Sequence, residues 1–241
     1  MTESILQIQQ MQFTWPKQAA PTLIIDQFDV KAGETVFMYG PSGCGKSTLL
    51  SLLAGVFLPQ QGQVLIKGKS WAQLGAAKRD RYRADQLGYI FQQFNLLPYL
   101  SVLDNVLLPC RFSAIRSDAA RLRSGSVQAD AQNWLAAMDL PQSAWDRPAK
   151  ALSVGQQQRV AAARALVGTP ALIIADEPTS ALDENRRDAF MGLLLGACAQ
   201  APSTLVFVSH DQRIASRFTR QVALPDINRA VQNNAEEEAL S

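Results

Sequence analysis

The 241-residue chain has little of several residue types that mark particular classes of protein. It contains one histidine and three cysteines, and Cys44, Cys110 and Cys198 lie far apart without a CxxC pair. We therefore expect neither a disulfide framework nor a structural zinc site, and this cysteine usage fits a reducing cytosol. The formal net charge is only +2, from 23 basic and 21 acidic residues. Because neither sign is in excess, no nucleic-acid partner is expected.

Long hydrophobic runs are also missing. The longest apolar stretch covers residues 189–199, well short of the roughly 20 residues that span a bilayer, and we expect it to form a packed helix. The N-terminus has neither the basic opening nor the apolar stretch of a secretory signal. Any role at a membrane is therefore expected to require a partner chain. Internal repeats are absent as well, which predicts a single copy of the domain rather than a tandem pair.

Apolar segments of strand length alternate with segments of helical period along much of the chain. The pairs are residues 35–39 with 46–54, 171–175 with 184–199, and 204–208 with 212–218. This alternation predicts the α/β class with a buried, mostly parallel sheet. We expect residues 1–232 to form one domain and residues 233–241, which are rich in polar and acidic side chains, to form a flexible tail.

Residues 95–150 lose the strand pattern and are predicted to form a helical subdomain inserted into the α/β core. Helices are expected over residues 101–108 and 117–138. Residues 111–126 carry four arginines among serine and alanine, which favours a basic, solvated helix and turn.

One glycine-rich segment predicts a phosphate-binding loop. Residues 40–47 read GPSGCGKS, match the pattern GxxxxGK[ST], and join the predicted strand 35–39 to the predicted helix 46–54. In such a loop the glycines let backbone N–H groups point at phosphate oxygens, and the helix N-terminus adds partial positive charge. Lys46 supplies a cation for the β- and γ-phosphates, and the Ser47 hydroxyl is a ligand for Mg²⁺. The predicted nucleotide contacts in this segment are Gly40, Pro41, Ser42, Gly43, Cys44, Gly45, Lys46, Ser47 and Thr48.

Two adjacent carboxylates end the predicted strand over residues 171–175. Asp176 is suited to hold the Mg²⁺ shell, and Glu177 is suited to orient and deprotonate a water that attacks the γ-phosphate. Alone, such a pair is more often a helix cap or a turn. The phosphate loop in the same chain favours the catalytic interpretation.

Two longer segments carry a resemblance to a known family. Residues 151–159 (ALSVGQQQR), followed by residues 175–183 (ADEPTSALD), resemble the ATPase subunit of ATP-binding cassette (ABC) transporters. The resemblance covers residues 13–224. Residues 89–98 (YIFQQFNLLP) resemble the branch that serves macrolide exporters and lipoprotein-release complexes. This resemblance implies an ABC-type P-loop NTPase core with an N-terminal antiparallel β region.

The resemblance also implies roles for residues that would be unremarkable alone. Gln92 matches the Q-loop glutamine, whose amide reaches Mg²⁺ or the attacking water. His210 follows the predicted strand 204–208 and matches the switch histidine, which hydrogen-bonds the γ-phosphate; a lone histidine there would otherwise be structural. Trp15 matches the aromatic residue that stacks on adenine, and core packing with Phe13 is the alternative.

Further matches imply that a second subunit completes the site. Ser153, Gly155 and Gln156 match the signature loop, which contacts the γ-phosphate bound by the opposite subunit. Asp183 matches the D-loop between subunits, and it is also placed to cap the helix that follows. Val154 departs from the family pattern LSGGQ. A β-branched side chain resists positive φ, so the effect of Val154 on closure and turnover is left open.

The resemblance implies an ATP- and Mg²⁺-dependent subunit that pairs with a second cassette, expected to be an identical chain, and energises a separate transmembrane permease. It places the chain at the cytoplasmic face of the inner membrane through that permease. A soluble ABC ATPase of translation or DNA repair is one alternative, although such proteins usually carry two cassettes or a coiled-coil insertion. A permease-linked regulatory clamp with low turnover is another. Substrate and direction of transport depend on the permease.

Overall fold

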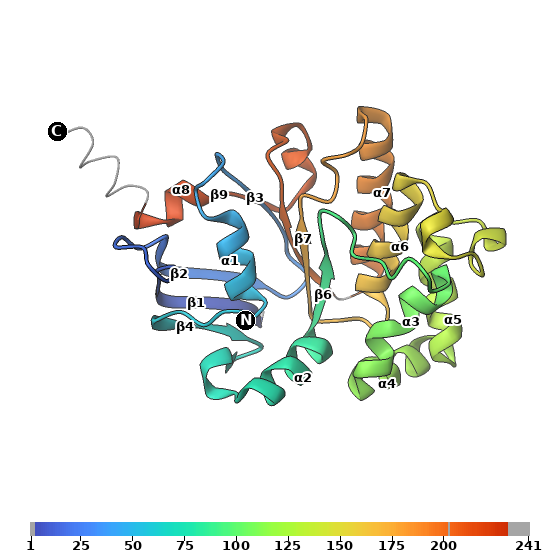
Figure 1. The fold of residues 1–241 in the computed structure, drawn as a ribbon, viewed down its shortest axis with the longest axis horizontal. Helices are drawn as coiled ribbons and strands as arrows, with labels where there is room; N and C mark the ends of the chain where they lie inside the picture. The colour runs from blue at the N-terminus through green and yellow to red at the C-terminus, as the bar shows by residue number, and fades with distance from the viewer. Residues whose placement is uncertain (1–2, 202, 231–241) are drawn as a thin grey trace. The chain divides into compact units, whose positions relative to one another are not determined.

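The computed structural model describes residues 3–201 and 203–230, and the chain divides into two compact units (Figure 1). Unit 1 comprises residues 1–83 and 206–241, and unit 2 comprises residues 84–205. The predicted tail, residues 233–241, lies outside the described residues.

Unit 1 contains an antiparallel sheet with the strand order β2-β1-β4-β5. The strands are β1 (Ser4–Phe13), β2 (Leu23–Lys31), β4 (Gln61–Ile66) and β5 (Lys69–Ser70). A register shift between Gln9 and Gln12 changes which residues of β1 face the core: Leu6 and Ile8 are buried before it, Met11 and Phe13 after it. The N-terminal antiparallel β region expected from the resemblance is confirmed.

The second sheet of unit 1 is parallel. β3 (Thr35–Tyr39) pairs in parallel with β9 (Arg220–Ala223), and β8 (Thr204–Val208), which crosses the boundary between the units, neighbours β3. Val36, Phe37 and Met38 are fully buried, as expected of a parallel strand covered on both faces.

The helices of unit 1 differ in part from the prediction. α1 (Lys46–Leu53) follows β3 as predicted. Residues 212–218, predicted to form a helix, instead give the 3₁₀ helix η4 (Gln212–Arg217), because only a few residues separate its cap, Asp211, from Phe218, where the backbone is extended again. The remaining helices are η1 (Trp71–Gln73), α2 (Ala76–Gln86), which runs into unit 2, and α8 (Leu224–Ile227).

Unit 2 combines parallel strands with a group of helices. β6 (Leu87–Ile90) pairs in parallel with β7 (Leu172–Asp176), and the first residues of β8 lie beside β7. α6 (Val154–Leu166) precedes β7 and α7 (Glu184–Gln200) follows it. The predicted helical segment forms α3 (Val102–Phe112), α4 (Ala114–Ser124), α5 (Val127–Ala137), η2 (Gln142–Ala144) and η3 (Ala149–Ala151), which gather beside α6 (Figure 1).

The single helix predicted over residues 117–138 is wrong. α4 ends where Gly125 adopts a left-handed conformation with φ of 80°, and Ser126 begins α5 by accepting a hydrogen bond from the backbone N–H of Ala129. A C-terminal glycine followed by an N-cap serine breaks a helix even when the helical apolar pattern continues across it.

The solvated character predicted for residues 111–126 is also wrong at one arginine. Arg116 is only 2% exposed, and its guanidinium donates hydrogen bonds to the carbonyls of Val167 (2.9 Å), Leu87 (3.0 Å) and Ala165 (2.8 Å). Burial lowers the pKa of Arg116 to about 10, so the group still carries its charge at neutral pH. Composition cannot reveal this, because buried arginines are exceptional and depend on distant partners.

Asp130 lies beside Arg116 in the same polar cluster. It is fully buried, accepts the backbone N–H of Gly168 at 3.0 Å, and receives hydrogen bonds from Arg123 and Ser124. Gly168 has φ of 66°, and a Cβ there would lie 2.4 Å from the Arg116 carbonyl oxygen, so only glycine fits. Together these groups attach α4 and α5 to the C-terminal end of α6.

In the part of the chain that the structure describes, no helix is both long and apolar enough to cross a membrane. Cys44, Cys110 and Cys198 are buried free thiols.

Candidate functional site

The glycine-rich segment of residues 40–47 forms a tight loop between β3 and α1 in unit 1. Gly43 has φ of 84° and Gly45 has φ of 100°, a region that residues with a Cβ rarely adopt. A Cβ on Gly45 would also come within 2.8 Å of a Leu23 methyl carbon. Glycine is thus required by the backbone at positions 43 and 45.

Positive charge gathers at this loop. The Lys46 ammonium donates hydrogen bonds to the carbonyls of Gly40 (2.8 Å) and Pro41 (2.9 Å), so it lies over the loop. Among the described residues, no side chain caps the N-terminus of α1 and no acidic residue lies in its first turn. The helix N-terminus and the lysine therefore offer an anion-binding site suited to phosphate.

Trp15 lies in unit 1 against the helix that starts at this loop. Its indole Nε1 donates to the Thr48 hydroxyl at 3.1 Å. Its ring packs edge-on against Phe13 (5.2 Å between centroids) and Phe57 (4.9 Å). The packing of Trp15 against Phe13 and Phe57 is observed, and its stacking on adenine stays a prediction.

A pocket of about 410 Å³ opens beside the phosphate loop in unit 1. It is lined by Gln18, Ala19, Ala20, Pro21, Thr22, Gly43 and Ala230. Sequence reasoning did not find this pocket, because its wall comes from the segment between β1 and β2, which matches no motif.

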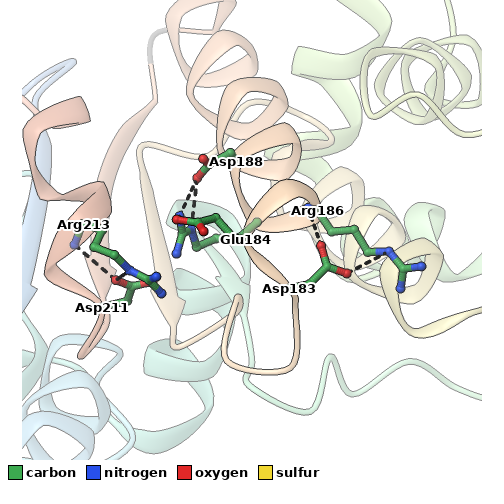
Figure 2. Close-up of polar contacts among 7 residues, drawn as sticks. Asp183, Glu184, Arg186, Asp188, Asp211 and Arg213 are labelled. Atoms are coloured by element: carbon green, nitrogen blue, oxygen red, sulfur yellow. Dashed lines mark hydrogen bonds and ion pairs between the residues drawn. The ribbon is translucent and has the colours of Figure 1, made fainter.

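His210 lies at the same sheet edge as the phosphate loop. β3 and β8 end together, since the backbone N–H of Ser209 donates to the Met38 carbonyl at 3.1 Å. His210 follows immediately and is exposed. The next residue, Asp211, forms an ion pair with Arg213 at 2.8 Å, which Figure 2 shows.

In unit 2, the predicted Q-loop residue and the two carboxylates follow neighbouring parallel strands. Ile90 of β6 pairs with Ala175 of β7, so Gln92 and Asp176 leave the sheet at the same edge. Tyr89 of β6 has its pKa raised far above the ordinary value, first by burial and then by the charge of Asp176. Asp176 therefore contributes negative potential at this edge.

Glu177, beside Asp176, has an unusual backbone conformation. Its φ is 42°, in the left-handed region, which costs of order 1 kcal/mol for a residue with a side chain. The segment after it forms a turn in which the Ser180 N–H donates to the Glu177 carbonyl at 3.2 Å, and Thr179 is buried. The buried side chain of Gln158, from α6, donates to the Pro178 carbonyl at 2.8 Å.

The segment after Gln92 is held by the same helix. Phe94 and Asn95 both have positive φ, of 59° and 47°. Arg164 of α6 donates to their carbonyls at 2.5 and 2.6 Å. Sequence reasoning missed Arg164 and Gln158, because hydrogen bonds from a side chain to a distant backbone carbonyl leave no pattern in the sequence.

Residues 153–156 begin α6 with a reciprocal cap. The Ser153 hydroxyl accepts the Gln156 N–H at 3.3 Å, and the Gln156 side chain accepts the Ser153 N–H at 3.1 Å. Val154 is the first helical residue and is not one of the residues with positive φ. The conformational obstacle considered for Val154 therefore does not arise, and its side chain is 50% exposed.

Asp183 caps α7, as one of its two predicted roles requires. Its carboxylate accepts the Arg186 N–H at 2.9 Å and pairs with the Arg186 side chain at 3.2 Å (Figure 2). A pocket of about 280 Å³ joins the start of α6 to this region of unit 2. Its lining residues are Ser153, Gly155, Gln156, Gln158, Arg159, Leu182, Arg186 and Phe190.

The predicted site residues thus fall into two sets, each inside one unit. Unit 1 brings together Trp15, the phosphate loop and His210, and unit 2 holds Gln92, Asp176, Glu177, Ser153, Gly155, Gln156 and Asp183. In the described ranges, no group of three or more His, Cys, Asp or Glu side chains is arranged to hold a metal ion.

Comparison with known proteins identifies the family. Residues 25–180 match the family described as ABC transporter. An uncharacterized ABC transporter ATP-binding protein of Mycobacterium tuberculosis is 34% identical over 240 residues, covering 96% of this chain and 94% of that protein. The lipoprotein-releasing system ATP-binding protein LolD of Hydrogenovibrio crunogenus is 35% identical over 228 residues, covering 94% of this chain and 96% of LolD.

Solved structures of ATP-binding cassettes are similar to this chain in fold as well as in sequence. The dimeric ATP-binding cassette MJ0796, in a post-hydrolysis state with ADP and Pi, is similar with a TM-score of 0.77 and 33% identity, covering 91% of this chain and 94% of that one. CbiO1 of Clostridium perfringens, part of the complex cbiONQ, has a TM-score of 0.73 and 27% identity, covering 87% and 79%. The expected ABC-type fold and the resemblance to the lipoprotein-release branch are thereby confirmed. The chain belongs to the ABC transporter family, as an ATP-binding and ATP-hydrolysing subunit.

Proposed function

We propose that this ATPase binds Mg²⁺·ATP at the phosphate loop of residues 40–47 and hydrolyses it with Glu177 as general base. The observation that carries the proposal is the loop itself: left-handed glycines, an uncapped helix N-terminus and the Lys46 ammonium meet at one place. Lys46 neutralises charge on the β- and γ-phosphates, and the first-turn N–H groups of α1 bind their oxygens. The pocket beside Gly43 leaves room next to the loop for part of the nucleotide. We assign Trp15, which hydrogen-bonds Thr48 of α1, to the contact with adenine.

Three predicted site residues carry side-chain oxygens, the ligand type that Mg²⁺ prefers. We assign the Ser47 hydroxyl, the Asp176 carboxylate and the Gln92 amide to the Mg²⁺ shell, with phosphate oxygens completing it. Ser47 is exposed at the start of α1, Asp176 ends β7 and Gln92 follows the paired strand β6, which supports their access to the ion. When bound, the ion neutralises charge that develops on the phosphates during transfer.

Hydrolysis needs a group that positions and deprotonates water. Glu177 has this role in the proposal, and its left-handed backbone, with φ of 42°, limits the directions in which its side chain leaves the chain. His210 donates a hydrogen bond to the γ-phosphate and helps hold the water. It follows β8 at the edge where the phosphate loop leaves β3, which supports this role.

A second copy of the chain completes each site. Ser153, Gly155 and Gln156, at the positive end of α6, contact the γ-phosphate bound by the partner, and Asp183 lies along the dimer contact. The similar cassette MJ0796 is dimeric, and a homodimer gives two such sites related by two-fold symmetry.

The partner in transport is a separate membrane-spanning permease, and the chain works at the cytoplasmic face of the inner membrane through it. ABC cassettes act with such permeases, and CbiO1 belongs to a larger complex. Large apolar side chains on unit 2 support a docking surface there: Tyr99 and Phe112 are both 72% exposed. We assign residues 1–232 to one cassette with residues 95–150 as its helical subdomain.

Relatives favour transport over the soluble alternatives, since LolD is the ATP-binding protein of a lipoprotein-releasing system and CbiO1 is part of an ABC transporter complex. The retained Lys46, Asp176, Glu177 and His210 favour real turnover over a low-turnover clamp.

The test replaces Glu177 with glutamine in the full chain. Glu177→Gln is expected to lower steady-state phosphate release at least 100-fold while ATP still drives dimer formation, because binding groups are intact and the base is lost. Glu34→Gln, a matched change in the turn before β3, should leave the rate unchanged. Phosphate release at the wild-type rate by Glu177→Gln would remove Glu177 from the role of base.

A further inference from the structure

We propose that Gln158 is a positioning residue for Glu177: its side-chain amide holds the backbone beside Glu177 in the conformation that presents the carboxylate. The inference rests on the proposed role of Glu177 as general base. Gln158 itself lies in α6 and contacts no nucleotide in the proposed hydrolysis.

The first observation is the contact itself. Gln158 is 1% exposed, and its Nε2 donates to the Pro178 carbonyl at 2.8 Å. A buried amide is tolerated where it is hydrogen-bonded, and this bond joins α6 to the segment that follows β7. Pro178 has no N–H to donate, so its carbonyl is the backbone group through which this residue can be held.

The second observation is the conformation of the neighbouring residue. Glu177 has φ of 42°, which a residue with a side chain keeps only where its surroundings impose it. Within the segment, Ser180 N–H bonds to the Glu177 carbonyl and Leu182 N–H to the Thr179 carbonyl. These bonds shape local turns, whereas the Gln158 bond fixes the segment against another element.

The third observation is where α6 begins. Ser153 and Gln156 cap the helix reciprocally, and Gln158 lies five residues after the cap, about 7.5 Å along the axis. One rigid helix thus links the loop proposed to meet the partner's ATP to the backbone beside this subunit's own base. A shift of α6 when the dimer closes would move Pro178 and, with it, the Glu177 carboxylate. The proposal therefore makes Gln158 a link between the two sites of the dimer.

The test is Gln158→Met, which keeps the side-chain length and removes the donor. The kcat for ATP hydrolysis by the full chain is expected to fall about 10- to 100-fold, because a base displaced by about 1 Å loses much of its effect. The KM for ATP should stay within about twofold, since the nucleotide contacts lie elsewhere. Gln158→Asn is too short to reach the Pro178 carbonyl, so its kcat and KM should change as in Gln158→Met. It provides a second variant if methionine prevents folding.

Ser203→Ala is the matched control. The buried Ser203 hydroxyl donates to the Pro170 carbonyl at 2.7 Å, a bond of the same kind just before β7 rather than after it. It should lower thermal stability to a similar extent and leave kcat unchanged. Full kcat in Gln158→Met, or an equal loss of kcat in Ser203→Ala, would overturn the proposal.

Glu177→Gln, measured in parallel, separates the two ideas. Adding Gln158→Met to Glu177→Gln should lower the residual rate no further, because the group being positioned is already gone. A further loss of the size seen in the single variant would show that Gln158 acts elsewhere. If Glu177→Gln is inactive and Gln158→Met is fully active, only the positioning role fails. If Glu177→Gln hydrolyses ATP normally, the proposed base fails and the positioning role fails with it.

Discussion

Replacing Arg116 with methionine removes a buried charge from the place where α4 meets the end of α6. The guanidinium donates to the carbonyls of Val167, Leu87 and Ala165, and the side chain is 2% exposed. Methionine fills a similar length but donates nothing, so three buried carbonyls lose a partner.

The magnitude follows from those three carbonyls. A buried acceptor left without a partner costs about 1 to 3 kcal/mol, and the lower end applies because a carbonyl has two lone pairs. Removing the buried charge also removes its desolvation cost, which offsets part of the loss. Three carbonyls at about 1 kcal/mol each, reduced by this offset, lead us to expect that Arg116→Met lowers the free energy of unfolding by about 2 kcal/mol.

Urea unfolding followed by circular dichroism measures this loss. Arg121→Met is the comparison, because Arg121 is an exposed member of α4 paired with Asp118 and should cost less than about 1 kcal/mol. Arg116→Lys should show most of the loss in unfolding free energy expected for Arg116→Met, because one ammonium cannot reach the three carbonyls that the planar guanidinium reaches. A loss below about 1 kcal/mol for Arg116→Met, or equal losses at Arg116 and Arg121, would refute the reasoning.

Three further predictions concern single residues. Trp15→Ala should weaken ATP binding about tenfold in a fluorescence titration, with Trp15→Phe retaining most of the affinity; equal affinity for all three proteins would assign Trp15 to packing alone. Val154→Gly should lower the free energy of unfolding by up to about 1 kcal/mol and change turnover less than about twofold, because Val154 is already helical; a large gain in turnover would contradict this. Cys198, whose pKa burial raises to about 12, should resist iodoacetamide at pH 8 in the folded protein and react after urea unfolding, as mass spectrometry would report.

The strands could be located from the sequence because of how parallel sheets are built. A strand buried on both faces is a short unbroken apolar run. The strand predicted over residues 35–39 has the same first and last residues as β3. The phosphate loop could also be predicted, since the left-handed backbone at Gly43 and Gly45 requires glycine locally. Local rules suffice where the cause of the structure is local.

Other features could not be predicted because their causes lie far away in the chain. Arg116, Gln158 and Arg164 each bond to backbone carbonyls between 20 and 70 residues distant, and no local pattern marks such partners. The break at Gly125 was missed for another reason. There the helical spacing of apolar residues continues from α4 into α5. It hides Gly125, which ends α4, and Ser126, which begins α5.

Val154 shows how a local argument fails when a neighbouring cap decides the backbone. Family glycine at this position suggested a need for positive φ, but Ser153 and Gln156 cap each other and set a helical start that any residue can adopt. At position 154 this chain therefore differs from the family pattern LSGGQ by carrying a side chain, while the backbone there is an ordinary helical start.

The central claim is that each ATP is hydrolysed at a site completed by a second copy of the chain. The most direct measurement mixes two inactive variants, Lys46→Ala in the phosphate loop and Ser153→Glu in the signature loop, and records phosphate release. An equal mixture should recover about a quarter of the wild-type rate, because half of the dimers pair unlike chains and each of these has one intact site out of two. No recovery in a mixture that still forms dimers, or full activity of Ser153→Glu alone, would contradict the account.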